Sequence, residues 1–154
     1  MPEARAQVVL AFDFGLRRIG IASGDTISGS AAPHSAVPST DQGPQWQSID
    51  RLLQQFRPDV LVVGSPRNAD GTAGAMSTAC DRFATELAAR SGRRVERCDE
   101  FSSSIEATER LRLQRKSGQR RRRVQRGDID SAAAAIILER WLSGEGRDDR
   151  STTG

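Results

Sequence analysis

The chain has 154 residues, of which 28% are charged and 36% hydrophobic, and its formal net charge is +3. This length fits a single domain with a sizeable core. The chain contains no apolar run long enough to span a membrane, and residues 1–10 lack the apolar centre of a signal peptide. Two cysteines, Cys80 and Cys98, match no metal-binding spacing and are typical of reduced thiols in a cytoplasmic protein.

In chain order, the pattern first predicts two strands, at residues 8–14 and 18–25, joined by a tight turn as an antiparallel hairpin. A weak edge strand followed by a loop is expected within residues 29–44, and His34 there is expected to be a surface residue of a loop. Apolar residues at helical spacing predict a helix over 46–56. An unbroken apolar run predicts a buried strand over 59–66.

The second half continues with a helix over residues 73–90, ended by Gly92, and a strand over 93–100. Serines that could cap a helix precede residues 105–114. The last helix is expected over 128–142, and residues 144–154 are expected to form a disordered tail. The alternation of helices and strands predicts one α/β domain over 1–143. Its mixed sheet has an antiparallel hairpin at one edge, parallel strands beside it and helices on both faces.

The charges are distributed unevenly along the chain. Residues 110–126, the basic segment, contain nine Lys or Arg and no acid, which leaves 14 basic against 20 acidic residues elsewhere. Such clustering is typical of a polyanion partner, most often nucleic acid. The alternative is a solvated, disordered charged loop.

Three acidic positions are expected to meet at the carboxyl edge of the sheet. Asp13 interrupts an apolar strand, Asp99 and Glu100 end the last parallel strand, and Asp128 and Asp130 open the last helix. Carboxylates gathered in this way need cations, and their hard oxygens suit Mg²⁺ or Mn²⁺, the ions that assist phosphodiester cleavage.

Each carboxylate also has a structural alternative. Asp13 could accept hydrogen bonds from the turn at Gly15, and Asp128 or Asp130 could be a helix N-cap. The carboxylates could also belong to a nucleic-acid-binding module that performs no chemistry.

Four blocks of sequence carry a family resemblance: FDFGLRRIGIASGD, VVGSPRNADGTAG, VERCDEFSSSIEA and DIDSAAAAIILERWL. Their order and spacing over residues 8–142 resemble the YqgF (RuvX) family, in the RuvC-like branch of the RNase H-like nucleases. The resemblance implies an RNase H-like mixed five-stranded sheet. It also implies a role in 5′-end processing of precursor 16S rRNA, with resolution of DNA Holliday junctions as the alternative.

By position, the resemblance assigns catalysis and metal binding to Asp13, Glu100 and Asp130, and Asp128 competes with Asp130 for the last role. Arg18 and Gly20 match the hairpin motif of the family, and Gly64, Pro66, Asp70 and Gly71 match a loop suited to a phosphate. Phe101 stands where the family usually has arginine.

We therefore expect a cytoplasmic, Mg²⁺- or Mn²⁺-dependent nuclease that binds RNA or DNA, acts as an endonuclease rather than an exonuclease, and is a monomer or a homodimer. The expected substrate-binding residues are all arginines: Arg17, Arg18, Arg110, Arg120, Arg121, Arg122 and Arg123.

Overall fold

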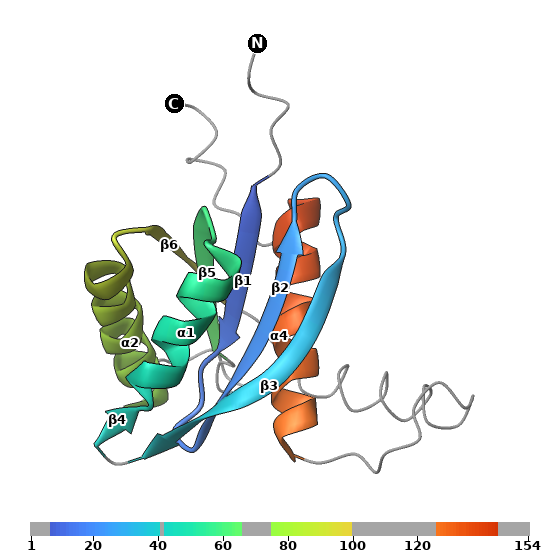
Figure 1. Ribbon diagram of the computed structural model, residues 1–154. Helices are drawn as coiled ribbons and strands as arrows, with labels where there is room; N and C mark the ends of the chain where they lie inside the picture. Colours follow the sequence, from blue (N-terminus) through green and yellow to red (C-terminus); the bar gives the residue numbers. More distant parts are fainter. Residues whose placement is uncertain (1–6, 41, 66–74, 100–125, 145–154) are drawn as a thin grey trace.

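The computed structural model describes residues 7–40, 42–65, 75–99 and 126–144. They form a six-stranded mixed sheet in the order β4-β3-β2-β1-β5-β6, with α1 and α2 on one face and α4 on the other (Figure 1). The strands are β1 (Val8–Asp13), β2 (Arg18–Asp25), β3 (Ala31–Thr40), β4 (Gly43–Pro44), β5 (Val60–Ser65) and β6 (Arg94–Asp99). The helices are α1 (Trp46–Phe56), α2 (Ala75–Ser91) and α4 (Arg126–Ser143).

The sheet separates two hydrophobic layers because side chains alternate along each strand. On β1, Leu10 and Phe12 pack in the layer beneath α1 and α2, whereas Val9 and Ala11 pack against α4. Cys80 and Cys98 are buried in different layers, so the sheet lies between the two thiols.

Most predicted elements are confirmed. The hairpin pairs β1 with β2 in antiparallel register, and β1, β5 and β6 are parallel neighbours. Helix α1 has the predicted bounds, and α2 ends just before Gly92, whose φ is +65°. No helix within the described ranges is long and apolar enough to cross a membrane.

Several details differ from the expectation. The sheet has six strands rather than five, because the two-residue β4 pairs with the end of β3. Strand β3 is ten residues long and contains His34, which was expected in a loop. His34 instead lies opposite Ile21, and its Nε2 hydrogen-bonds to Ser23 Oγ at 2.6 Å.

Helix α4 begins at Arg126, earlier than predicted, so the N-cap alternative for Asp128 and Asp130 is wrong: both lie inside the helix. The helix expected after Ser102, most of the basic segment and the tail after Gly144 lie outside the described residues.

Candidate active site

The candidate site lies where the parallel strands β1, β5 and β6 end. Asp13 is the last residue of β1 and is paired with Gly20 of β2 on one side and Gly64 of β5 on the other. Ser65, which follows Gly64, is paired with Asp99 at the end of β6. The register therefore brings the carboxyl end of β1 and that of β6 to one edge of the sheet, as predicted.

Asp13 is a buried carboxylate with an unsatisfied oxygen. Its exposed fraction is only 5%, and within the described part of the chain its Oδ1 has no hydrogen-bond partner. Burial, and then the negative charge of Asp130, raise the pKa of Asp13 from 3.8 to about 8. The structural alternative was that Asp13 accepts hydrogen bonds from the turn at Gly15. That role does not explain Oδ1, which accepts no hydrogen bond from the described residues.

Asp130 is brought to this site by α4. Arg18 Nε, at the start of β2, donates a hydrogen bond to Asp130 Oδ2 at 2.8 Å, in an ion pair that is only partly buried. One residue further, Ser131 Oγ accepts a hydrogen bond from the backbone N–H of Ile21 at 3.1 Å. These two contacts connect the first turns of α4 to β2.

A glycine makes this close approach possible. A Cβ atom at Gly20 would lie 1.9 Å from the backbone oxygen of Asp130, so any side chain there would clash with α4. Gly20 is also the residue of β2 that pairs with Asp13 of β1, so the backbone of α4 lies directly over β2 next to Asp13. The position of Asp130 is thus set by backbone packing as well as by Arg18.

The residues present fit a divalent cation. Two carboxylates with oxygen donors suit Mg²⁺ or Mn²⁺, and the unpartnered Oδ1 of Asp13 is an oxygen that a cation would satisfy. The described ranges contain no group of three potential ligands. Glu100, the third predicted ligand, follows β6 in the sequence and lies outside those ranges.

The predicted arginines divide into three cases. Arg17 is exposed in the turn after β1, as a phosphate-binding residue needs to be. Arg18, predicted to bind phosphate, is engaged with Asp130. Arg110 and residues 120–123 lie outside the described residues, as do Pro66, Asp70, Gly71 and Phe101. The contacts of Arg18 with Asp130 and of Ser131 with Ile21 were not predicted from the sequence. The position of Ser131 directly after Asp130 was the one signal that pointed to a role for Ser131.

Asp128 and Asp130 differ in their surroundings. Asp128 is in the first turn of α4, where a negative charge interacts favourably with the helix dipole. Asp130 is the carboxylate whose charge acts on Asp13. The arrangement therefore favours Asp130 as the partner of Asp13.

Comparison with known proteins agrees with this geometry. The profile of the RuvX family, described as "Holliday junction resolvase", matches residues 7–144. The chain belongs to the RuvX family.

Curated relatives of this RuvX chain match it over nearly their whole length. A protein of Chromohalobacter salexigens is 43% identical over 143 residues, which cover 93% of this chain and 94% of the relative. One of Edwardsiella ictaluri is 38% identical over 141 residues, covering 92% and 98% respectively. Both are named "Putative pre-16S rRNA nuclease".

Solved structures similar to this RuvX chain share its fold at low sequence identity. Thermus thermophilus RuvC in complex with a Holliday junction substrate has a TM-score of 0.52 and 16% identity, covering 92% of this chain and 98% of that one. The yeast mitochondrial Holliday junction resolvase Ydc2 has a TM-score of 0.54 and 14% identity, covering 89% and 78%. The expected RuvC-like, RNase H-like fold is thereby confirmed.

Proposed function

We propose that this RuvX protein is a divalent-metal-dependent endonuclease whose site is built on Asp13, Glu100 and Asp130. The observation that carries the proposal is the buried Oδ1 of Asp13, which has no hydrogen-bond partner among the described residues, beside the charge of Asp130. A buried carboxylate at the end of a strand, with a second carboxylate from a helix beside it, is unfavourable for a purely structural role. A bound cation compensates both the burial and the repulsion.

Asp13 and Asp130 would hold Mg²⁺ or Mn²⁺ together with Glu100, which follows β6 in the sequence. When bound, such an ion supplies Lewis-acid stabilisation of the charge that develops on phosphodiester oxygens during hydrolysis. The contribution of the chain is to fix its ligands. Asp13 is fixed by a strand paired on both sides, and Asp130 by Arg18 and the close contact of α4 with Gly20.

The substrate is held by positive charge outside the carboxylate cluster. Arg17 is exposed in the turn that follows Asp13 and Phe14, so its guanidinium can reach a phosphate near the reacting one. The basic segment adds nine cationic side chains to an otherwise acidic chain. We assign it to the sugar-phosphate backbone, with little dependence on base sequence.

We propose precursor 16S rRNA as the substrate, because relatives whose alignments cover 92–93% of this chain are named "Putative pre-16S rRNA nuclease". The second candidate is a DNA four-way junction. It is favoured by the description of the RuvX family and by the fold shared with RuvC, whose structure holds a Holliday junction.

The deciding experiment is a cleavage assay with a precursor 16S rRNA fragment and a four-way DNA junction side by side, in Mg²⁺, in Mn²⁺ and in chelator. Wild-type protein should cleave one of them only with a divalent ion, and Asp13→Asn should abolish cleavage. Asp50→Asn is the matched control and should cleave normally, because it removes a half-exposed carboxylate of α1 that pairs with Arg90 at 3.8 Å, outside the carboxylate cluster.

A circular single-stranded version of the cleaved substrate separates the two modes of cutting, since only an endonuclease opens it. Failure of the wild-type protein to cleave any substrate with either ion would refute the nuclease. Binding without metal and without cleavage would identify a nucleic-acid-binding module instead. Normal cleavage by Asp13→Asn would remove Asp13 from the site.

A further inference from the structure

Ser131 is a buried polar residue at the start of an apolar run of α4. It is only 1% exposed, and the four alanines that follow it, residues 132–135, are buried as well. An alanine at position 131 would fill nearly the same space, favour the helix more strongly and leave no polar atom to satisfy. Packing alone therefore does not explain the hydroxyl. What distinguishes it from an alanine is the hydrogen bond that Oγ accepts from the backbone N–H of Ile21, at 3.1 Å.

The strand that Ser131 contacts has a β-bulge at this point. The register of β2 and β3 shifts by one residue between Ile19 and Ile21, so that two residues of β3 lie opposite the single Gly20. Such a bulge bends the strand and interrupts its regular hydrogen bonding. Helix α4 contacts β2 here: a Cβ atom at Gly20 would lie 2.7 Å from the backbone nitrogen of Ser131, and closer still to the carbonyl group of Asp130. The peptide bond between Asp130 and Ser131 therefore lies on the bulge.

The contact of Ser131 with β2 also sets the direction of the preceding side chain. Consecutive side chains of an α-helix point about 100° apart, so fixing one of them fixes the other. With the hydroxyl of Ser131 on β2, the side chain of Asp130 is turned toward Arg18, whose Nε donates to Oδ2 at 2.8 Å. The negative charge of Asp130 also acts on Asp13. Arg18 thus holds the carboxylate of Asp130, and Ser131 holds the helix that carries it.

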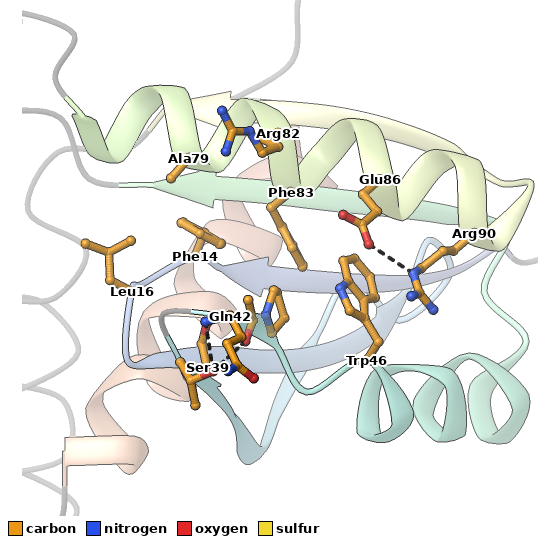
Figure 2. A pocket seen from close by; sticks show the side chains of 13 residues that line it. Phe14, Leu16, Ser39, Gln42, Trp46, Ala79, Arg82, Phe83, Glu86 and Arg90 are labelled. Atoms are coloured by element: carbon orange, nitrogen blue, oxygen red, sulfur yellow. Dashed lines mark hydrogen bonds and ion pairs between the residues drawn. The ribbon is translucent and has the colours of Figure 1, made fainter.

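The end of β1 that carries Asp13 is held separately, from the other face of the sheet. Phe14, the next residue, forms an aromatic cluster with Phe83 and Trp46 (Figure 2). The ring of Phe83 lies 5.1 Å from Phe14 and 5.4 Å from Trp46, centroid to centroid. The backbone N–H of Phe14 also donates to the carbonyl oxygen of Gly64 at 2.9 Å. Because Asp13 is fixed in this way, the distance between the two carboxylates depends on how α4 is placed.

We propose that Ser131 is a positioning residue of the candidate site: its hydroxyl holds α4 on the bulged strand so that the carboxylate of Asp130 faces that of Asp13. Asp130 would contact the cation directly, whereas Ser131 would act only through the helix. The inference rests on the proposed function in taking a divalent cation as the ligand of the two carboxylates.

The test compares Ser131→Thr with Ser131→Val. These two side chains have the same shape, but only threonine keeps a hydroxyl, so any strain from the added methyl group is common to both variants. If the larger side chains prevent folding, Ser131→Ala is compared with wild type instead, because it removes the hydroxyl without adding bulk. Trp141→Phe is the control. It removes the hydrogen bond from Trp141 Nε1 to Glu96 Oε1 at 3.0 Å, which joins α4 to β6 about 15 Å farther along the helix.

Mn²⁺ binding is measured by calorimetry on metal-free protein, and kcat and KM are measured on whichever proposed substrate the wild type cleaves. Ser131→Val should bind Mn²⁺ about 10- to 100-fold more weakly than Ser131→Thr, and its kcat should be lower to a similar degree with KM unchanged. Trp141→Phe should lower Tm without changing the affinity for Mn²⁺. The inference is overturned if the valine and threonine variants bind Mn²⁺ equally. It is also overturned if Trp141→Phe weakens Mn²⁺ binding as much as Ser131→Val does, because general loosening of α4 would then explain the effect.

A double-mutant cycle of Arg18→Gln and Asp130→Asn, measured by urea unfolding in chelator, reports the position of Asp130 without metal or cleavage. The coupling between these two residues should be present with Ser131→Thr and lost with Ser131→Val. If the wild-type protein cleaves nothing and binds no Mn²⁺, the nuclease is refuted and the cycle alone decides the inference, which a coupling that persists with valine overturns. If the wild type cleaves with metal but the valine and threonine variants do not differ, the inference is refuted and the nuclease stands.

Discussion

Replacing Asp13 by Asn should stabilise the metal-free protein, and the gain should grow with pH. Burial and the charge of Asp130 raise the pKa of Asp13 from 3.8 to about 8. Between these values the folded protein keeps a proton that the unfolded chain releases. Raising the pH therefore favours unfolding of the wild type across this window. The amide introduced by Asp13→Asn does not titrate and escapes the effect.

The magnitude follows from the width of the window. Each pH unit between the two pKa values costs the wild type about 1.4 kcal/mol of unfolding free energy, or about 4 kcal/mol by pH 7. The amide of Asn would replace a carboxyl group whose Oδ1 has no hydrogen-bond partner within the described ranges, and an unsatisfied buried amide costs about 1–3 kcal/mol. The net gain should be about 2 kcal/mol at pH 7, or about 4–8 °C in Tm, and should vanish near pH 5.

The assay is urea denaturation of wild type, Asp13→Asn and the Asp50→Asn control at pH 5, 6, 7 and 8, in chelator. Adding Mn²⁺ should stabilise the wild type by about 2.7 kcal/mol at one hundred times its Kd, and should not stabilise Asp13→Asn. A stability difference between Asp13→Asn and wild type that does not change with pH would refute the argument. So would an Asp13→Asn protein that is less stable than wild type at pH 8.

Three further results are expected. Gly20→Ala should destabilise the protein by several kcal/mol in thermal denaturation, because its Cβ would overlap the backbone of Asp130. Gly127→Ala is the control: its Cβ would make only an ordinary contact at 3.5 Å, so it should be neutral or slightly stabilising. Arg18→Gln should change the free energy of unfolding by less than about 1 kcal/mol, since the Arg18–Asp130 ion pair is partly exposed. It should nevertheless lower kcat about 10- to 100-fold, because Asp130 is no longer held in place. Equal kcat for Arg18→Gln and wild type would exclude this positioning role. Replacing residues 120–123 together by Ala should weaken RNA and DNA binding alike, and the slope of log Kd against log salt should fall by about one unit for each phosphate that is no longer neutralised. Single-turnover cleavage at saturating substrate should fall far less than in the Asp13 variant. Unchanged affinity and salt slope would show that the basic segment is a solvated loop.

Local periodicity was sufficient to predict the elements whose pattern matches their environment. The alternating hairpin and the helix of Trp46–Phe56 follow directly from it, and Arg57, in the left-handed region with φ of 45°, ends that helix where predicted. Strand β3 was underestimated because Pro33 and Pro38 weaken the strand signal. Its pairing with β2 supplies the stability that the local sequence does not indicate.

The candidate site was predictable to a similar degree. Asp13 could be identified as a site residue because it is a lone carboxylate in an apolar strand, and a buried carboxylate needs a compensating partner. The contact of Arg18 with Asp130 was not predictable from pattern, since it joins residues 112 positions apart and depends on how closely α4 approaches β2. Glu100 stays a prediction. The aromatic cluster around Phe14 was not predictable either, because its residues come from separate elements and meet only when the helices pack on the sheet.

Asp13 lies on a strand that is hydrogen-bonded on both sides, and this position affects when the site is lost as the protein unfolds. Backbone segments at the margins of a fold open and exchange their amide hydrogens through local fluctuations, whereas a central strand opens mainly when the whole domain unfolds. β1 is such a strand, with β2 on one side and β5 on the other. In hydrogen exchange, the amides of β1 should therefore be among the slowest, and those of the edge strand β6 should exchange earlier. Asp13 should stay in place until the whole domain unfolds, whereas Glu100, which follows β6, is the proposed ligand that local opening would release first.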